Sequence, residues 1–287
     1  MSDITTPRVW FITGTSTGLG RAIAEVALEK GEIVIATARR PSTLGDLAQR
    51  HPKERLLILP LDVTQREQVV DAFAEATRAF GRIDIVFNNA GFGDLGEFEG
   101  IEEPKARAVL ETNFWGAISV TKEAVKCFRE TNPAGVGGRL LQMSSYQGLV
   151  GLPGCSFYSA SKFALEGASE VLAAELDPAW NIKVTNIEPG WIRTEVVPKA
   201  TWSPEHPAYY QNPDLPTTHI RRVGLDKLVT WKDARRSAEV FYKIACVPNP
   251  PLHFVVGKDA IEGTRKKIAA LVADIDTYEA WSEGLEE

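Results

Sequence analysis

Two side chains four residues apart, Tyr158 and Lys162, could carry out acid–base chemistry on one atom. On a helix this spacing places both on the same face. A phenol with an ordinary pKa of ~10 holds its proton tightly near neutrality, and a nearby lysine cation favours the phenolate. We therefore expect Lys162 to lower the pKa of Tyr158. A tyrosine that merely packs beneath a solvated lysine has the same spacing, so other motifs in the chain are needed to distinguish a catalytic pair from a structural one.

A glycine-rich stretch near the N-terminus follows a short apolar run. Residues 8–12 are predicted to form a buried strand, and residues 13–20 read Thr-Gly-Thr-Ser-Thr-Gly-Leu-Gly. A helix is expected over residues 21–30 and a second strand over residues 33–36. This order is typical of a dinucleotide-binding unit, in which the turn approaches a pyrophosphate at a helix N-terminus. A glycine turn that binds nothing is the alternative.

Alternating segments continue along the chain and predict one α/β domain. Further strands are expected at 56–59, 83–87, 139–143, 182–187 and 253–256, and helices at 42–50, 66–80, 104–130, 156–177, 231–246 and 260–281. This alternation predicts a single doubly wound Rossmann-type domain over residues 1–287, with a parallel seven-stranded sheet and helices on both faces. Ligands are then expected at the carboxyl edge of the sheet.

Together these features resemble the short-chain dehydrogenase/reductase family, in the branch with a Thr-Gly-x-x-x-Gly-x-Gly turn. The further matching motifs are Asp62-Val63, Asn88-Asn89-Ala90-Gly91, Asn113, Ser144-Ser145, Pro189-Gly190 and Thr194. Residues 8–194 match well. Residues 195–232 and the C-terminal helical tail at about 260–287 match only in general layout.

The resemblance implies catalytic roles for Asn113, Ser145, Tyr158 and Lys162. Tyr158 would give a proton to a carbonyl oxygen during reduction and take it back during oxidation, while Lys162 would also hold the nicotinamide ribose. Ser145 would donate a hydrogen bond to the developing alkoxide, with Ser144 as the alternative. Asn113 would anchor a water that exchanges protons with Lys162, or else be a structural asparagine bonded to backbone.

The same resemblance implies a set of cofactor-binding residues. Asp62 would contact the adenine, Asn89 and Ala90 would flank the adenosine ribose, and Thr194 would hold the carboxamide. The full expected set is Gly14, Thr15, Ser16, Thr17, Gly18, Leu19, Gly20, Arg39, Arg40, Asp62, Val63, Asn89, Ala90, Gly91, Tyr158, Lys162, Pro189, Gly190, Ile192 and Thr194.

The end of the second strand favours NADP(H) over NAD(H). An acidic residue there would bind the ribose hydroxyls of NAD, whereas a basic one can accept the extra phosphate of NADP. The chain has Thr37-Ala38-Arg39-Arg40, and a guanidinium suits a phosphomonoester. We therefore expect NADP(H), with two solvent-exposed loop arginines as the alternative. Thr17 stands where some NADP users carry a second basic residue.

A proline-rich stretch at about 195–230 is expected to form a lid over the substrate. It carries several prolines and aromatic residues and few helix signals. The residues expected to line the substrate pocket are Phe92, Gln147, Leu152, Phe157, Trp191 and Trp202. They favour an apolar, aromatic or lipid-like carbonyl substrate, although packing without ligand contact is the alternative.

Composition excludes several other classes of protein. A net charge of −6 without a basic stripe argues against a nucleic-acid binder, and pairs such as Arg221-Arg222 are interpreted as solvated. Three widely spaced cysteines give neither a disulfide framework nor a zinc pattern, so no metal is expected. No membrane span or leader pattern is visible. We expect a cytoplasmic protein that, by resemblance, forms a homodimer or homotetramer.

The sequence therefore predicts an NADPH-dependent oxidoreductase that interconverts a ketone or aldehyde and an alcohol. An NADP-binding protein that senses redox state without turnover is one alternative, and an alcohol dehydrogenase that works in the oxidative direction is another. A nucleotide-sugar epimerase also uses Tyr-x-x-x-Lys, but that branch usually has a different glycine spacing and a larger C-terminal lobe.

Overall fold

The computed structural model describes residues 6–194 and 202–285. Within them, seven strands form one sheet in which all neighbouring strands run parallel, in the order β3-β2-β1-β4-β5-β6-β9. The strands are β1 (Val9–Ile12), β2 (Ile33–Ala38), β3 (Leu56–Pro60), β4 (Ile85–Asn88), β5 (Gly138–Met143), β6 (Ile182–Pro189) and β9 (His253–Val256). The predicted seven-stranded parallel sheet is confirmed.

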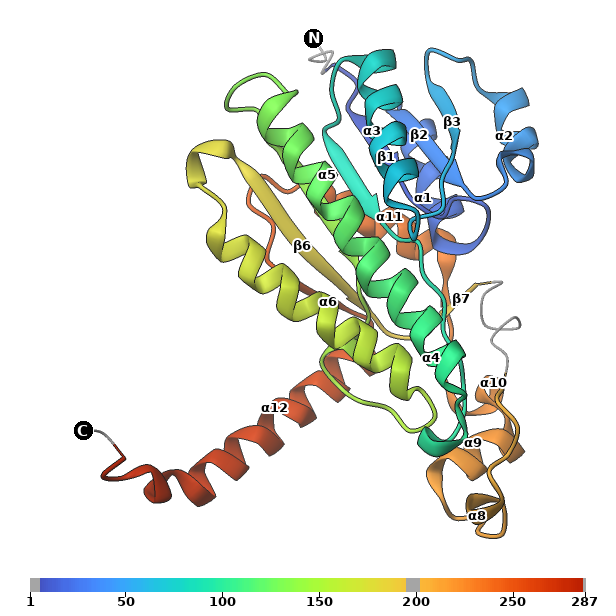
Figure 1. Ribbon diagram of the computed structural model, residues 1–287, viewed down its shortest axis with the longest axis vertical. Helices are drawn as coiled ribbons and strands as arrows, with labels where there is room; N and C mark the ends of the chain where they lie inside the picture. Colours follow the sequence, from blue (N-terminus) through green and yellow to red (C-terminus); the bar gives the residue numbers. More distant parts are fainter. Residues whose placement is uncertain (1–5, 195–201, 286–287) are drawn as a thin grey trace.

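Helices cover both faces of this sheet (Figure 1). One face carries α1 (Gly18–Glu29) and α11 (Ala234–Ala245), and the other carries α3 (Arg66–Phe80), α5 (Ala117–Glu130) and α6 (Ser156–Glu175). The short helix α2 (Gly45–Arg50) follows β2. This is the doubly wound arrangement that the sequence predicted.

The residues of β1 show how the sheet separates two apolar cores. Trp10 and Ile12 pack with α1 and α11, whereas Val9 and Phe11 pack with α3 and α5. Successive residues of a strand point to opposite faces, and all four are buried. Both faces of the strand therefore require apolar residues, which explains its continuous hydrophobic run.

The chain order reverses beside β1, which pairs with β2 on one side and β4 on the other. In open sheets of this kind, ligands bind at such a switch point, beyond the carboxyl ends of the strands. The turns that follow β1, β4, β5 and β6 all lie at this edge.

The helix predicted over residues 104–130 is interrupted. It consists of α4 (Glu103–Leu110), a π-helical turn η3 (Glu111–Gly116) and α5. Periodicity alone did not reveal the interruption, because one extra residue within a turn changes the apolar spacing very little. Asn113 lies in this turn.

The proline-rich stretch contains more helix than its few helix signals indicated, in the part that is described. Residues 195–201 lie outside the described residues, but α8 (Pro207–Tyr210), α9 (Pro216–Val223) and α10 (Leu225–Leu228) follow. Pro207 and Pro216 begin α8 and α9. At the first helical position a proline is well tolerated, because the missing N–H would have no partner there.

The last helix, α12 (Lys258–Tyr278), follows β9 and ends in the short turn η6 (Glu279–Ser282). Figure 1 shows it extending away from the sheet and its covering helices. In the described parts of the chain, no helix has the length and apolar character that crossing a membrane requires. A separate two-stranded sheet pairs β7 (Ile192–Arg193) with β8 (Lys232–Asp233).

Candidate active site

The turn after β1 is tied to the turn after β4 by hydrogen bonds. Thr13 Oγ1 accepts from the amides of Asn89 at 2.8 Å and Ala90 at 2.9 Å. Asn89 Nδ2 donates to the Thr13 carbonyl at 2.9 Å. Asn89 and Ala90, which the resemblance placed beside a ribose, therefore also hold the glycine turn in position.

Three positions of this turn favour glycine, two because of their backbone conformation and one because a side chain has no space. Gly14 and Gly18 have φ values of 70° and 61°, which favour glycine. A Cβ at Gly20 would overlap the carbonyl oxygen of Gly14 and lie 2.6 Å from Asn89 Nδ2. A Cβ at Gly18 would lie 3.4 Å from Thr194 Cβ, so Thr194 borders the turn.

The helix α1 begins inside this turn. Thr17 is its N-cap and makes no side-chain capping bond, and Ser16 and Leu19 complete the turn around it. The first amides of a helix have no intrahelical partner and attract anions. The turn is therefore a cradle that fits a pyrophosphate.

Thr15 links the glycine turn to the end of β2. Its amide and its hydroxyl both donate to the Thr37 carbonyl at 2.9 Å, and Thr37 Oγ1 donates to the Ile12 carbonyl at 3.0 Å. Arg39 and Arg40 follow directly and are exposed. The two arginines expected to bind phosphate thus stand at the same edge as the glycine turn.

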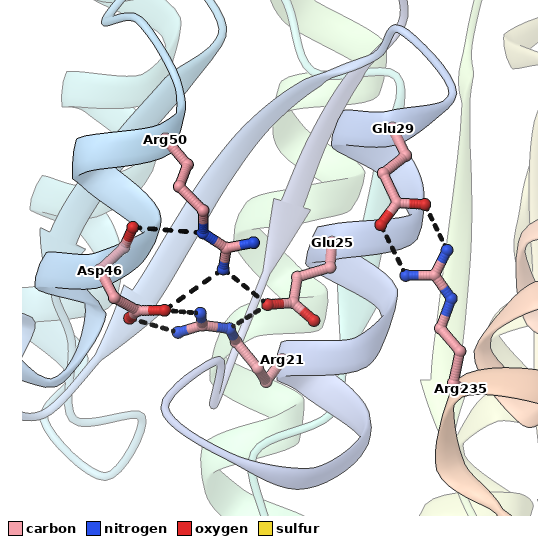
Figure 2. A network of polar contacts seen from close by, with 6 residues as sticks. All are labelled: Arg21, Glu25, Glu29, Asp46, Arg50 and Arg235. Atoms are coloured by element: carbon pink, nitrogen blue, oxygen red, sulfur yellow. Dashed lines mark hydrogen bonds and ion pairs between the residues drawn. The ribbon is translucent and has the colours of Figure 1, made fainter.

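Other arginines in this region are bound to carboxylates, as Figure 2 shows. Arg21 pairs with Glu25 at 2.9 Å and with Asp46, and Arg50 pairs with the same two carboxylates at 3.0 and 3.2 Å. Arg21 holds the pKa of Asp46 well below its ordinary value, at about 2. Among the residues that the structure describes, Arg39 forms no such ion pair.

The turn after β3 contributes Asp62 and Val63. Asp62 Oδ1 accepts from the amide of Thr64 at 3.0 Å and from its hydroxyl at 2.8 Å, so this carboxylate shapes its own turn. Val63 is buried against Gly116, where a Cβ would come within 2.7 Å of Val63 Cγ2. Both residues thus lie between β3 and the π-helical turn.

Asn113 is almost fully buried and joins three segments. Its Oδ1 accepts from the Phe92 amide at 3.0 Å, while its Nδ2 donates to the Phe92 carbonyl at 2.8 Å and to Ser161 Oγ at 3.0 Å. A Cβ at Gly91 would lie 2.9 Å from Asn113 Oδ1. These bonds match the structural alternative for Asn113, and they fix the loop after β4 against the helix that carries Tyr158.

The helix α6 brings Lys162 and Tyr158 to the carboxyl edge. Lys162 Nζ donates to the carbonyl of Met143, at the end of β5, at 2.6 Å. It lies 5.6 Å from the centre of the Tyr158 ring. The Ser145 side chain accepts from the Gln147 amide at 3.1 Å and also hydrogen bonds with Tyr158. Ser145 therefore lies next to Tyr158, and its hydrogen bond to a substrate oxygen stays a prediction.

Burial controls the protonation of this pair. It raises the pKa of Tyr158 to about 12, against a smaller lowering by Ser145, and it lowers the pKa of Lys162 to about 8. The expectation of a lowered pKa for Tyr158 is therefore wrong for this structure, because desolvation of the phenolate is the largest contribution and Lys162 is not among the groups that shift this pKa. At neutral pH Tyr158 keeps its proton and Lys162 remains mainly charged.

One turn beyond Lys162, α6 carries a buried carboxyl group, Glu166. Glu166 faces Glu188 of β6 and His253 of β9. The Nδ1 atom of His253 lies 2.7 Å from Glu188 Oε1 and 3.5 Å from Glu166 Oε2. Burial raises the pKa of Glu166 to about 8 and that of Glu188 to about 7. The three ligand atoms lie within 4.8 Å of one another, although the sequence gave no reason to expect a metal. The Glu166 charge favours the cation of Lys162.

The turn after β6 is fixed by a carboxylate. The Gly190 amide donates to the Val256 carbonyl at 2.9 Å, and a Cβ at Gly190 would overlap the carboxylate of Asp259. Asp259 accepts from the Trp191 amide at 3.1 Å and pairs with Lys232 at 2.5 Å. Pro189 ends β6 and Ile192 begins β7, and the Trp191 ring between them lies edge-on to Trp231 with ring centres 5.9 Å apart.

An apolar cavity of about 170 Å³ lies next to these turns. Leu152, Trp191 and Trp202 line it, in agreement with their expected place. The sequence missed the other lining residues, which are Leu95, Pro153, Cys155, Ile220, Leu225, Leu228 and Val229. Cys155, three residues before Tyr158, connects the cavity to the catalytic helix.

Three residues expected in the pocket do not line this cavity. Phe157 stacks on Phe98 with ring centres 5.5 Å apart. Gln147 is buried and accepts a hydrogen bond from Ser159 Oγ at 3.1 Å. Phe92 is 39% exposed. Their proximity to the catalytic residues in sequence did not determine the direction in which their side chains point.

A buried ion pair fastens α9 beside the cavity. Arg221 donates to the two carboxylate oxygens of Glu97 at 2.9 and 2.8 Å and to the Ser203 carbonyl at 2.7 Å. Its guanidinium lies 4.5 Å from the centre of the Trp202 ring. Interpreting Arg221 as solvated was wrong, because its partner is 124 residues away and leaves no local pattern.

Comparison with known proteins agrees with this geometry. A family model described as short chain dehydrogenase matches residues 8–203. An uncharacterised oxidoreductase of Schizosaccharomyces pombe is 40% identical over 272 residues, which are 94% of this chain and 89% of that protein. The 3-ketodihydrosphingosine reductase of Bacteroides thetaiotaomicron is 32% identical over 256 residues, which are 88% of each chain.

A solved structure shares the whole fold. A short-chain dehydrogenase from Streptomyces avermitilis has a TM-score of 0.86 and 33% sequence identity, and the match covers 99% of this chain and 100% of that one. The similarity thus includes the segments after residue 203, which the family model leaves unmatched.

Proposed function

The chain belongs to the short-chain dehydrogenase family, and from this premise we propose that it is an NADPH-dependent reductase of apolar carbonyl compounds. The observation that carries the proposal is the convergence of Ser145, Tyr158 and Lys162 at the carboxyl edge of the sheet, with an apolar cavity that reaches Cys155 at the start of the same helix, α6. The same groups can serve alcohol oxidation, because an acid in one direction is a base in the other.

Tyr158 is suited to protonate a carbonyl oxygen. Its pKa of about 12 keeps the phenol neutral near pH 7, so the proton is available as the oxygen becomes an alkoxide. Ser145 would donate a hydrogen bond to the same oxygen, a type of interaction worth roughly 3 kcal/mol in other enzymes. Lys162, held by the Met143 carbonyl, places a positive charge beneath the ring. When bound, the nicotinamide supplies or accepts the hydride.

The residues at the sheet edge fit a dinucleotide. Gly14, Gly18 and Gly20 form the turn at the start of α1 where a pyrophosphate would lie, and a side chain at Gly20 would overlap the Gly14 carbonyl and so distort this turn. Arg39 is exposed at the end of β2, where an adenosine ribose would lie by the family's arrangement. A guanidinium there favours the ribose phosphate of NADP over the bare hydroxyls of NAD.

The cavity is apolar and small, so it would enclose only the apolar end of a substrate. An apolar cavity of about 150 Å³ holds one benzene molecule, so about 170 Å³ accommodates one ring or a short length of alkyl chain. The related reductase from Bacteroides thetaiotaomicron is named for a long-chain keto compound. We therefore place α9, α10 and Trp202 as a cover over the apolar end of a carbonyl substrate.

The test is NADPH oxidation by the wild type and by Tyr158→Phe, with a panel of aromatic, alkyl-chain, steroid and sugar carbonyls. The wild type should reduce an apolar member, and the variant should lose at least ~100-fold in kcat while its Kd for NADPH stays the same. Equal turnover by the two proteins would defeat the assignment of Tyr158. Tight NADPH binding with no turnover in either direction would favour a redox sensor.

The cofactor preference has its own test. In Arg39→Ala, the ratio of kcat/KM for NADPH over NADH should fall by ~10- to 100-fold, because a charge-assisted contact to phosphate is lost. Arg50→Ala is the matched control, since that arginine is already paired with Glu25 and Asp46. An unchanged ratio in Arg39→Ala would contradict the NADP assignment.

A further inference from the structure

The helix α12 leaves the body of the protein after its first two turns. Ala260 and Thr264 are buried, but every residue from 265 to 285 is exposed. A helix of 21 residues is about 30 Å long, and Figure 1 shows most of that length away from the rest of the chain. An isolated helix of this size is only marginally stable in water, since helices in proteins depend on packing.

The exposed part carries an apolar stripe. Ile268, Leu271, Val272, Ile275 and Tyr278 are between 48% and 56% exposed. Their spacing of three, one, three and three residues places them along one side of the helix. Such a stripe is typical of a helix face that packs against another element, and no part of the described chain covers this one.

Charged residues border the stripe on both sides, and they are basic at its N-terminal end and acidic at its C-terminal end. Arg265 and Lys267 flank it in the first half of the exposed helix, and Asp274 and Asp276 flank it in the second half. At 100° per residue, Lys267 and Asp274 lie on one edge and Arg265 and Asp276 on the other. Each of these two pairs is centred on the same point, between Ala270 and Leu271.

We propose that α12 is a dimerisation helix that packs antiparallel against α12 of a second copy of this chain. In a two-fold antiparallel pair, each edge of one helix meets the same edge of the other in reversed direction. Lys267 then faces Asp274 of the second copy, and Arg265 faces Asp276 of the second copy. The apolar residues from Ile268 to Ile275 are centred within one residue of that axis, so they cover one another.

The charge pattern favours this occupant over a lipid surface. A helix that lies on an anionic membrane carries lysine and arginine along its polar face. In α12 the second half and the turn after it carry Asp274, Asp276, Glu279 and Glu283 and no basic residue. These carboxylates would be repelled by an anionic bilayer, whereas the basic half of a second copy attracts them.

The test is the mass of the full-length protein by light scattering after size exclusion. The acidic variant Arg265→Asp/Lys267→Asp and the basic variant Asp274→Lys/Asp276→Lys place like charges along the whole stripe. Each should have half the wild-type mass, which is an even multiple of 31.5 kDa. An equal mixture of the two variants should regain the wild-type mass, because an acidic helix pairs with a basic one.

A matched control separates this pairing from a general effect of charge. Lys266 lies on the side of α12 away from the stripe, so Lys266→Asp should keep the wild-type mass. A monomeric wild type, or variants whose mass equals that of the wild type, overturns the proposal. A lipid-binding result also overturns it. In that case the wild type is monomeric and floats with phosphatidylcholine/phosphatidylserine vesicles, and the variant Ile268→Asp/Ile275→Asp no longer floats, because the stripe binds lipid.

Discussion

The two halves of the sheet hold their buried polar groups in different ways. In the half formed by β1 to β4, Thr13 and Asn89 bond to each other and to neighbouring backbone groups. The buried carboxylate of Glu32 pairs with Arg8 at 2.9 Å. These groups are neutral or matched in charge, so no change of protonation is expected among them near neutral pH. We call β1 to β4 and the turns that follow them the fixed half.

In the half formed by β5, β6 and β9, the buried groups are ionisable and incompletely paired. Glu166 and Glu188 face each other with one histidine between them. The side-chain atoms there that lack a hydrogen-bond partner within the described structure are Ser144 Oγ, Glu166 Oε1, Asn186 Oδ1 and Glu188 Oε2. Shifted pKa values gather at functional sites more often than elsewhere, so this half is where protonation changes are expected.

The largest expected effect is in the fixed half. Gly20→Ala should weaken NADPH binding by at least ~100-fold, or about 2.7 kcal/mol, because a Cβ there overlaps the Gly14 carbonyl and crowds Asn89 Nδ2. Calorimetric Kd values measure it, with circular dichroism to show that the variant is folded. In Gly45→Ala, where a Cβ meets nothing within 4 Å, the Kd should not change. Normal binding by Gly20→Ala would mean that this turn is not rigid.

The fixed half is also the part that the sequence predicted best. Its glycines, Thr13 and Asn89 lie within short motifs that directly follow strands, and parallel strands bring their carboxyl ends together without further information. The position of Ser145, in the turn after β5, was predictable for the same reason, and the spacing of Tyr158 and Lys162 predicted that both lie on one face of a helix. The roles of these residues toward a cofactor or substrate are still predictions.

The other half depends on contacts between distant residues. Glu166 reads as one more polar position of α6, and nothing in the sequence indicates that it meets Glu188 and His253. The sign of the Tyr158 pKa shift was wrong for a related reason. Sequence gives the spacing of two charges but not how far both are removed from water, and here burial has the larger effect.

An intermediate effect is expected from the buried carboxyl groups. Their pKa values in the folded protein, about 8 for Glu166 and about 7 for Glu188, are above that of an unfolded chain, so the native state binds protons more tightly. The stability that these two groups contribute is therefore complete below pH 4.5, the ordinary pKa of a glutamate, decreases as the pH rises above it, and is lost once the pH has passed through 7 to 8. A shift of more than one unit corresponds to more than about 1.4 kcal/mol.

Glu166→Gln removes the group that must ionise. Between pH 5.5 and 8.5, the free energy of unfolding in urea should fall less in this variant than in the wild type. Glu175→Gln is the control, because Glu175 is the last residue of α6 and is exposed. Identical pH dependence in wild type and Glu166→Gln would show that Glu166 is already ionised, and the contrast between the two halves would be lost.

The smallest expected effect concerns the apolar cavity, which tolerates change because side chains rather than backbone form it. Trp202→Ala should raise KM for an apolar carbonyl by ~10-fold, since part of the substrate loses its apolar contact. The Kd for NADPH should stay constant, because the residues that line the cavity with Trp202 include none of the glycine turn. Tyr210→Ala, an exposed aromatic in the same segment that does not line the cavity, should change neither value. If Trp202→Ala weakened NADPH binding as much as substrate binding, the cover formed by α9, α10 and Trp202 would contribute to binding the cofactor as well as the substrate.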